Sequence, residues 1–383
     1  MFKCDRLFRL AIEFRGFKLW ARNRNVRTLT QFANSILKKT RNPSSLRILS
    51  EQDTEQFKSF FLTIIEDLTN HNLISSIDEV NDRMGQIMNY CVSGGKQVRP
   101  SLLIAAYKFI RTETGLVGES IEDAIKLAWC LEMMASFFLV LDDILDNSEK
   151  RRGKLCWYKN EDVGMNAIND AVLIQMGLFE LLKKYFINHK FYQQIVDVFL
   201  VVNLKTFVGQ TLDCNSNNIS TFSWKKFNEM CDNKTGYYTY YFPIVLAMYL
   251  AERADLQLQE KAFDIFMELG RFYQYQNDYL DCFSKFGTDI EEGKCTWLIL
   301  SALEKASPKQ KNILEKNYGK CSKESVEKIK NIYIEMNLNN SFDDQLEKTK
   351  DKVNAHLKKI ENSLSQRMMR KLALVSLGYE TYL

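Results

Sequence analysis

Hydrophobic residues recur every three or four positions through most of the chain from residue 51 onward, a spacing that places them on one face of an α-helix. The first such segment contains Phe57, Phe61, Ile64 and Leu68. The alternation of apolar and polar residues that is typical of β-strands is hardly present. Turn signals such as Gly94-Gly95 divide the pattern into segments of about 15 to 25 residues. The pattern therefore predicts about ten helices and one all-α domain over residues 51–383.

The first 50 residues have a different composition, because they are rich in Arg, Lys, Ser and Thr and carry only Asp5 and Glu13 as acidic residues. Basic positions are interspersed with apolar ones, as in the stretch from Arg6 to Leu10. This acid-poor, amphipathic pattern predicts a mitochondrial transit peptide in residues 1–50. The alternative is a basic helix that docks on the domain or lies on an anionic surface, in a protein that stays in the cytoplasm.

Composition and charge exclude several other classes of protein. The chain has 383 residues and a formal net charge of +4, which is too small to indicate nucleic-acid binding. Its nine cysteines include no Cys-x-x-Cys pair, and its three histidines lie far apart, so neither a zinc site nor a His-based catalytic triad is expected. The longest apolar run, around Phe242 to Ala251, is shorter than the roughly 18 residues of a membrane span, so we expect no transmembrane segment.

An apolar run that contains the aromatic pair Phe137 and Phe138 and then three aliphatic residues leads directly into an acidic motif. The acidic residues of this motif are Asp142, Asp143 and Asp146. On a helix, Asp142 and Asp146 are one turn apart, so their carboxylates share a face. Like charges at this spacing repel each other, whereas Mg²⁺, which prefers oxygen ligands, would neutralise them. The segment therefore predicts a Mg²⁺ site, with a diphosphate as the natural partner of the metal.

A second polar cluster begins at Asn277 and ends at Asp281, again after aromatic residues that include Phe272 and Tyr275. Asn277 and Asp281 also share one face of a helix. Two such motifs, far apart in the chain, can face each other across a helical bundle and hold metal ions between them.

The sequence resembles the trans-isoprenyl diphosphate synthase family, and most closely its farnesyl diphosphate synthase branch. The motifs that carry the resemblance occur in the family's order and are Gly94 to Arg99, Asp142 to Asp146, Arg151-Arg152-Gly153, Gly209-Gln210 with Asp213, Lys234-Thr235, Asn277 to Asp281, and Lys285 to Asp289. The resemblance covers roughly residues 85 to 300 of the chain. The resemblance implies an all-α isoprenoid synthase bundle around a central cavity, and a homodimer.

Residue roles follow from the same resemblance. It implies that Asp142, Asp143 and Asp146 bind two Mg²⁺ ions and that Asn277 and Asp281 bind a third. Catalytic roles in holding and releasing the allylic diphosphate would fall to the two aspartates Asp142 and Asp146 and to the basic residues Arg151, Lys234 and Lys285. The other implied substrate-binding residues are Lys96, Arg99, Arg152, Gln210, Thr235 and Gln274, together with Phe137 and Phe138, which would close the floor of the hydrocarbon pocket.

The departures from the family pattern cluster on the pocket for the second substrate, isopentenyl diphosphate. Val98 stands where Asn is usual, Pro100 where Gly is usual, and Ala135 where a Gln reaches that substrate. The chain ends without the basic run that closes over the second diphosphate, and Asn277 replaces the first acid of the second motif. Losing such charge-assisted contacts should weaken binding of the second substrate.

These departures favour a terpene synthase, which uses one substrate instead of two. It would ionise a prenyl diphosphate, with farnesyl diphosphate as the expected substrate, and release a sesquiterpene and diphosphate. Terpene synthases of this descent occur among insects, so the resemblance extends to an insect-type enzyme. The first alternative is a short-chain prenyltransferase, a farnesyl or geranyl diphosphate synthase that consumes isopentenyl diphosphate. A third is a non-catalytic, subunit-like protein, against which the intact acidic motif argues.

Overall fold

The computed structural model describes residues 48–115, 120–215, 218–253, 255–283, 287–360 and 363–377. Nearly all of the predicted transit peptide, the predicted site residue Lys285 and the last six residues of the chain lie outside the described residues. The core begins slightly earlier than expected, because Ile48 and Leu49 are already buried. Ser50 then caps the first described helix by accepting a hydrogen bond from the backbone of Asp53.

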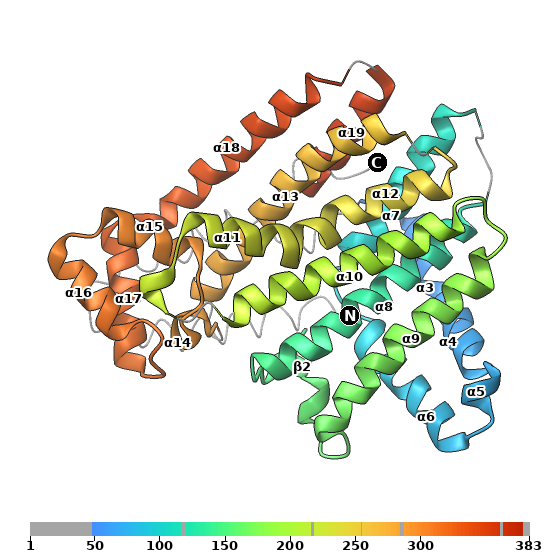
Figure 1. Ribbon diagram of the computed structural model, residues 1–383, viewed down its shortest axis with the longest axis horizontal. Coiled ribbons are helices and arrows are strands. Elements are labelled where there is room, and N and C mark those ends of the chain that lie inside the picture. Colours follow the sequence, from blue (N-terminus) through green and yellow to red (C-terminus); the bar gives the residue numbers. More distant parts are fainter. Residues whose placement is uncertain are drawn as a thin grey trace, which may run out of the picture. The chain divides into compact units, whose positions relative to one another are not determined.

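The described residues are mainly helical (Figure 1). The α-helices are α3 (Glu51–Ser59), α4 (Phe61–Thr69), α5 (Asn72–Ser75), α6 (Asp78–Ile87), α7 (Val98–Glu113), α8 (Glu122–Leu145), α9 (Ala167–Phe186), α10 (Tyr192–Cys214), α11 (Trp224–Cys231), α12 (Phe242–Leu250), α13 (Leu256–Phe283), α14 (Asp289–Glu292), α15 (Trp297–Lys305), α16 (Pro308–Asn317), α17 (Lys323–Glu335), α18 (Leu338–Leu357) and α19 (Ser363–Ser376).

Shorter elements connect these helices. The π-helical segments are η2 (Met88–Val92) and η6 (Asp232–Tyr241), the 3₁₀ turns are η3 (Trp157–Lys159), η4 (Gly164–Asn166) and η5 (Ile219–Thr221), and the strands are β1 (Lys150–Arg151) and β2 (Lys154–Leu155). The two strands pair in antiparallel fashion as a small hairpin directly after α8. The prediction of an all-α fold is confirmed.

Helix α8 lies at the centre of the domain, where it packs between α7 and α9. Its side chains are apolar nearly all round and most of them are buried, as expected for a core helix. The helix ends at Leu145, so Asp142 and Asp143 lie in its last turn and Asp146 is its C-cap. The first acidic motif therefore lies at the C-terminal end of the core helix α8.

Two close backbone contacts hold η6 between its neighbours. A Cβ atom at Gly209 of α10 would lie 2.2 Å from the backbone nitrogen of Lys234, and one at Gly270 of α13 would lie 2.3 Å from the Cα atom of Gly236. Only glycine permits such an approach. The π-helical segment therefore carries Lys234 and Thr235 into the space between α10 and α13.

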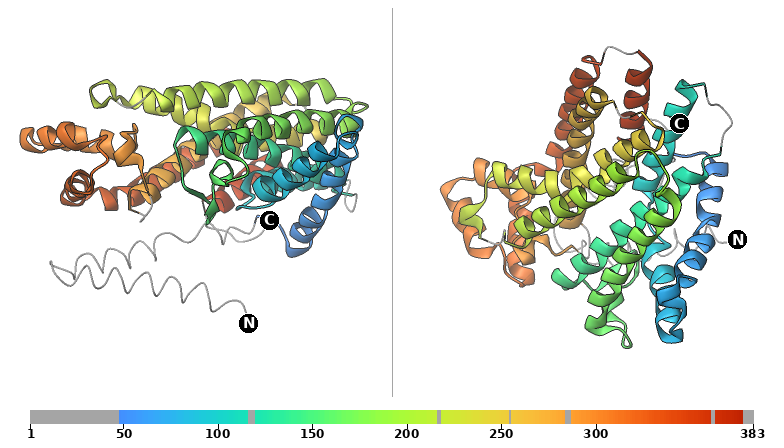
Figure 2. Two further views of the ribbon diagram at one scale, coloured as in Figure 1. Left: turned by 90° about the horizontal axis from the view of Figure 1, so that it is seen from below. Right: turned by 45° about the vertical axis from the view of Figure 1, so that its right-hand side comes forward.

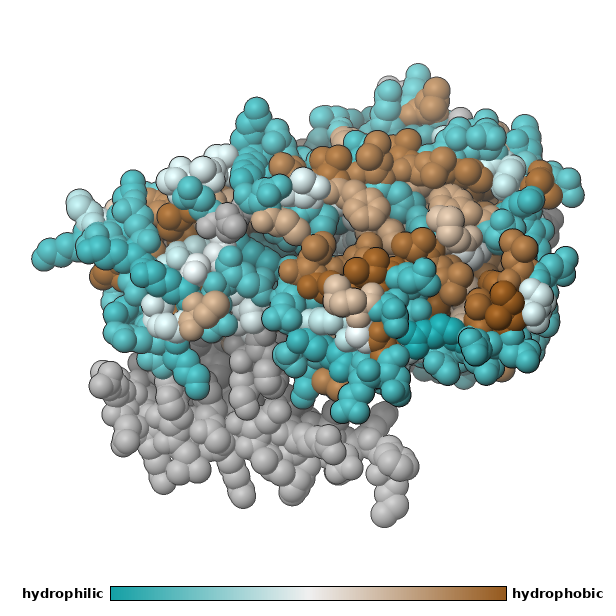
Figure 3. Space-filling view, turned by 60° about the horizontal axis from the view of Figure 1, so that its bottom comes forward, coloured by the Kyte–Doolittle hydropathy of each residue, from teal (hydrophilic) through white to brown (hydrophobic). Residues whose placement is uncertain are grey.

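Helix α10 runs along one edge of the domain (Figure 2, left), and it exposes much of its apolar surface. The exposed large hydrophobic residues of this region are Met165 in η4, Ile168, Val172 and Met176 on α9, and Leu200, Val201, Leu204, Phe207 and Val208 on α10. A space-filling view shows hydrophobic side chains gathered on one face of the molecule (Figure 3).

Two helices are more apolar over their whole length than the uninterrupted apolar runs in the sequence indicated. Among the described residues, α8 and α10 are both long and apolar enough to cross a membrane by length and composition. Counting uninterrupted runs missed them because single polar residues, such as Glu132 and Ser136 in α8, break the run without lowering its mean hydropathy much. In α8, 78% of the apolar window is buried inside the fold, which accounts for its composition. In α10 only 33% is buried.

Candidate active site

Asp142 lies at the centre of a cluster of polar side chains from several elements. Its Oδ1 accepts hydrogen bonds from Lys234 Nζ and from Gln210 Nε2, both at 3.1 Å, and its Oδ2 accepts one from Arg151 at 3.2 Å. Burial alone would raise the pKa of this carboxyl, but the positive charges of Lys234 and Arg151 lower it to about 2. Asp142 is therefore ionised at neutral pH, with α10, η6 and β1 each supplying one partner.

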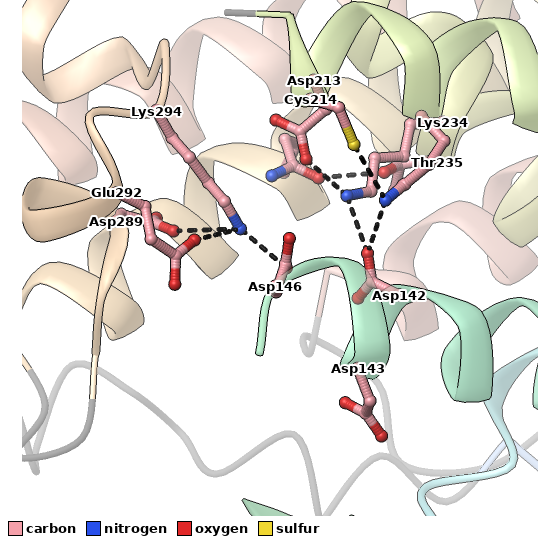
Figure 4. Close-up of polar contacts among 12 residues, drawn as sticks. Asp142, Asp143, Asp146, Asp213, Cys214, Lys234, Thr235, Asp289, Glu292 and Lys294 are labelled. Atoms are coloured by element: carbon pink, nitrogen blue, oxygen red, sulfur yellow. Dashed lines mark hydrogen bonds and ion pairs between the residues drawn. The ribbon is translucent and has the colours of Figure 1, made fainter. Parts of the chain in front are cut away.

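A second lysine, Lys294, joins the first acidic motif to the segment that follows the second one (Figure 4). Its Nζ lies 2.8 Å from Asp146 Oδ2, 3.0 Å from Glu292 and 3.8 Å from Asp289. Burial opposes the charge on Lys294, but the surrounding carboxylates raise its pKa. Lys294 was not predicted as a site residue, because it is a single lysine beyond the last motif that carried the resemblance.

Lys234 likewise bridges two carboxylates from different helices. Besides Asp142, it contacts Asp213 of α10 at 2.6 Å. Asp213 was noticed as part of a motif but not predicted as a site residue, and its side chain is nearly buried. The two lysines together compensate carboxylates of α8, α10 and the α14 region.

The three acids of the first motif do not all face the same way. Figure 4 shows Asp142 and Asp146 turned toward the lysines and Asp143 turned away from them. Asp143 is buried and accepts a hydrogen bond from Arg151 Nε at 2.8 Å. Burial raises the pKa of Asp143, and Arg151 opposes that shift. The expected shared face of Asp142 and Asp146 is present, whereas Asp143 anchors Arg151.

The second residue of the second motif, Asp278, belongs to a buried hydrogen-bond network. Its carboxylate accepts hydrogen bonds from Gln274 Nε2 at 2.8 Å and from the backbone of Trp297 at 3.2 Å. Gln274 in turn accepts a hydrogen bond from Thr235 Oγ1 at 2.9 Å. Burial raises the pKa of Asp278 to about 7. The predicted residues Thr235 and Gln274 are thus brought together, and they connect η6 to α13.

The two predicted metal ligands of the second motif differ in their surroundings. Asp281 Oδ1 accepts a hydrogen bond from the backbone nitrogen of Asp289 at 3.0 Å, at the start of α14, and Asn277 is exposed. Lys294 contacts both Asp146 and Asp289, and Asp289 is hydrogen-bonded to Asp281, so the two acidic motifs belong to one polar cluster.

The acidic side chains as arranged here are separated by lysine and arginine. Within the described ranges, no three Asp, Glu, His or Cys side chains converge closely enough to hold a metal ion. Their oxygen donors nevertheless suit Mg²⁺ chemically. Cations that now neutralise the carboxylates would be available to a diphosphate if Mg²⁺ took their place.

Four aromatic rings lie one turn below the polar cluster. Phe137 and Phe138 of α8 contact each other, and Phe138 also contacts Tyr238 of η6 with ring centroids 5.8 Å apart. Phe207 of α10 contacts Phe138 at 5.1 Å and Phe137 at 5.7 Å. The predicted pair beneath the acids is therefore part of a larger aromatic group, and the contributions of Phe207 and Tyr238 to it were not predicted.

A second group of cations surrounds the buried Glu132 of α8. Arg152 donates a hydrogen bond to Glu132 at 3.5 Å, and Arg99 stacks on the ring of Tyr238 at 3.9 Å and donates one to Thr239. Burial raises the pKa of Glu132 to about 7, although Arg99 and Arg152 act in the opposite direction. One carboxylate oxygen of Glu132 and the Nε of Arg99 are buried without a hydrogen-bond partner.

Two further positions were linked to the second substrate in the sequence, Lys96 as a predicted ligand and Ala135 as a departure from the family pattern. Lys96 is exposed, in the turn before α7. Ala135, which stands where the family has Gln, is fully buried three residues after Glu132.

The polyprenyl synthetase family model matches residues 81–336. The chain belongs to this family. It is 38% identical to the farnesyl pyrophosphate synthase of Nezara viridula over 332 residues, which cover 85% of this chain and 82% of the relative. It is 34% identical to that of Gallus gallus, with 85% of this chain and 92% of the relative covered.

A solved structure of Trypanosoma brucei farnesyl diphosphate synthase in complex with risedronate is also similar. The TM-score is 0.76 at 26% identity, and the match covers 83% of this chain and 97% of that one. The family and the isoprenoid synthase fold expected from the sequence are confirmed. The relatives are synthases of a prenyl diphosphate, so the comparisons favour our alternative, a prenyltransferase, over our main prediction of a terpene synthase.

Proposed function

We propose that the protein is a Mg²⁺-dependent short-chain prenyltransferase that condenses isopentenyl diphosphate with an allylic diphosphate, as a farnesyl diphosphate synthase does. Its relatives of that name match over most of their length. The observation that carries the proposal is the presence of two separate cationic groups. One surrounds Asp142 and Asp146, and the other surrounds Glu132. Two diphosphates need two such groups, because each carries several negative charges.

The first group suits ionisation of the allylic substrate. Arg151, Lys234 and Lys294 each already contact a carboxylate of the first motif. When the allylic carbon–oxygen bond breaks, the electron pair leaves with the diphosphate, and these three cations would neutralise the growing charge. The predicted catalytic residue Lys285 lies outside the described residues, and we retain it as a proposal.

Mg²⁺ would be held mainly by Asp142 and Asp146, whose carboxylates face the lysines proposed to bind the diphosphate. When bound, it would supply further neutralisation of the leaving diphosphate. Asp281 and Asn277 would hold the third of three ions, with Asn277 contributing a neutral oxygen. Asp143 would act through Arg151, because its carboxylate anchors that guanidinium.

The second group suits the diphosphate of isopentenyl diphosphate. Arg99 and Arg152 lie near Glu132, and their stacking and hydrogen bonds hold them in place. Lys96 would close over the diphosphate from the turn before α7. The double bond of the second substrate would then attack the allylic carbon, a carbon–carbon bond would form, and a proton would leave the new cation.

A terpene synthase is the second candidate, and a specific observation favours it. The buried Ala135 offers no polar side chain where the family has Gln, and Val98 offers none where the family has Asn. Both changes reduce contact with isopentenyl diphosphate and leave the group around Asp142 intact. In that case the allylic cation would lose a proton or capture water without condensation.

One product assay distinguishes the two candidates. Purified protein with Mg²⁺ is offered geranyl or farnesyl diphosphate alone, and then together with isopentenyl diphosphate, and volatile and diphosphate products are analysed separately. We expect longer prenyl diphosphates that appear only when isopentenyl diphosphate is present. Hydrocarbons or terpene alcohols from a single substrate, without elongation, would instead identify a terpene synthase.

We also propose a homodimer in which the exposed apolar face of α9 and α10 is covered by a second copy. Large apolar surfaces of this kind are unusual on monomers. The side chains on this face include Val172, Leu200 and Leu204, which are between 45% and 68% exposed. Sedimentation of wild type and of Leu204→Asp tests this idea, because a charge at this position should shift the protein to the monomer.

The proposed mitochondrial destination rests on the basic first 50 residues alone. Fusing residues 1–50 to a fluorescent protein and observing it in cells tests the proposal. Diffuse cytoplasmic fluorescence would contradict it, and Arg-to-Gln changes at Arg6, Arg9 and Arg15 should abolish import if the basic face acts as the signal.

A further inference from the structure

Two rows of side chains run side by side from the polar cluster into the apolar interior, one on α8 and one on α10. At the polar level, Gln210 of α10 donates a hydrogen bond to Asp142 of α8 at 3.1 Å. About one turn lower, Phe207 contacts Phe138 with ring centroids 5.1 Å apart. Residues three or four positions apart on a helix share a face, so the same two helix faces meet at both levels.

Phe207 also reaches the other member of the aromatic pair. Its ring lies edge-on to Phe137, with centroids 5.7 Å apart and an interplanar angle of 74°. Edge-to-face contacts of this kind are favourable and hold the rings in a defined orientation. Phe207 therefore supports both phenylalanines from the side of α10.

The same residue is 40% exposed and belongs to the apolar face of α9 and α10. One edge of its ring thus contacts the aromatic group below the acids, and another part lies at the surface proposed for the second copy. Among the four rings of the aromatic group, Phe137, Phe138 and Tyr238 are at most 9% exposed, so Phe207 alone of the four joins the interior to that surface.

We propose that Phe207 is a specificity-determining residue that limits the length of the prenyl chain, as a third wall beside Phe137 and Phe138. This inference rests on the proposed use of prenyl diphosphates. A hydrocarbon tail that extends downward from the diphosphate at Asp142 meets Phe138 first and then the ring that supports it. Removing the Phe207 ring would let both phenylalanines move aside and admit a longer tail.

The test compares Phe207→Ala and Phe207→Trp with the wild type. We expect Phe207→Ala to raise the ratio of longer to shorter prenyl chains by about tenfold. This is the smaller end of the discrimination that apolar pockets reach when one hydrocarbon contact changes. Phe207→Trp should shift the ratio in the opposite direction. The ratio is measured both from products and from kcat/KM for geranyl, farnesyl and geranylgeranyl diphosphate.

The matched control is Leu204→Ala on the same exposed face of α10, one turn earlier, where the side chain is 68% exposed. It should leave the chain-length ratio unchanged. A shift of equal size in Leu204→Ala, accompanied by dissociation in sedimentation experiments, would mean that the dimer and not the ring sets chain length. Unchanged ratios in both Phe207 variants would also overturn the inference.

Binding measurements separate failure of this inference from failure of the proposed function. Calorimetry with thio-analogues of geranyl, farnesyl and geranylgeranyl diphosphate reports chain-length preference without turnover. A wild type that turns over no allylic diphosphate, yet shows the expected change of preference in Phe207→Ala, would refute the function and keep the inference. Circular dichroism of each variant verifies that it is folded.

Discussion

Replacing Lys294 by Met would test whether the polar cluster depends on a residue that no sequence motif marked. Its ammonium group lies within 3.0 Å of Asp146 and Glu292 and 3.8 Å from Asp289. Methionine has a similar length but no charge. The substitution leaves three carboxylates near one another without their shared cation, and it should raise the pKa of both Asp146 and Asp289 further.

The expected loss of stability follows from the burial of the cluster. Breaking a fully buried ion pair costs roughly 3 to 5 kcal/mol, and the 20% exposure of the Lys294 side chain reduces this to about 2 to 3 kcal/mol. In a chain of this size, that loss lowers Tm by a few degrees. Activity should fall more steeply, by about 10² to 10³ in kcat, because one preorganised cation is missing when the diphosphate leaves.

The assay combines thermal unfolding, turnover and Mg²⁺ titration. Without Lys294 the carboxylates repel one another, so Mg²⁺ added without diphosphate should raise Tm more in Lys294→Met than in the wild type. The matched control is Lys225→Met, because Lys225 is 86% exposed and lies 4.0 Å from Glu229. If Lys294→Met matched this control in Tm, kcat and Mg²⁺ response, the assignment of Lys294 to the site would be refuted.

Three further predictions concern other parts of the site. Asp142→Asn should destabilise the protein at pH 7 by about 2 kcal/mol, because the pKa of Asp142 in the folded protein, about 2, lies below the ordinary 3.8. The stability that ionised Asp142 contributes is present above pH 3.8 and is lost as the pH falls toward 2. The difference in unfolding free energy between wild type and variant, measured with urea, should therefore be smaller at pH 3 than at pH 7. Gly209→Ala should lower the free energy of unfolding by about 3 kcal/mol or more and abolish most activity, because its Cβ would collide with the backbone of Lys234. The control Gly85→Ala, whose Cβ would meet nothing within 4 Å, should be neutral or stabilising in the same unfolding assay. Ala135→Gln should strengthen isopentenyl diphosphate binding in calorimetry by about tenfold, and unchanged affinity would mean that this departure does not matter.

The sequence alone determined the fold class and the first acidic motif. Helical spacing of apolar residues is a local property, so it predicted the all-α domain without knowledge of packing. The shared face of Asp142 and Asp146 follows in the same way from their spacing, since both lie on a single element. The family could be recognised because its motifs are short strings that stay contiguous in the chain.

Only the tertiary structure decided which residues from different elements meet. Side chains from distant parts of the chain meet in the fold, as Lys294 meets Asp146 and Phe207 meets Phe138, and neither contact has a local signal in the sequence. Asp143 has the same side chain as Asp142 and Asp146, but it faces away from the lysines. A helix rotates about 100° per residue, and this rotation places Asp143 against Arg151. Spacing along one helix can be read from the chain, whereas contacts between helices depend on how their side chains pack.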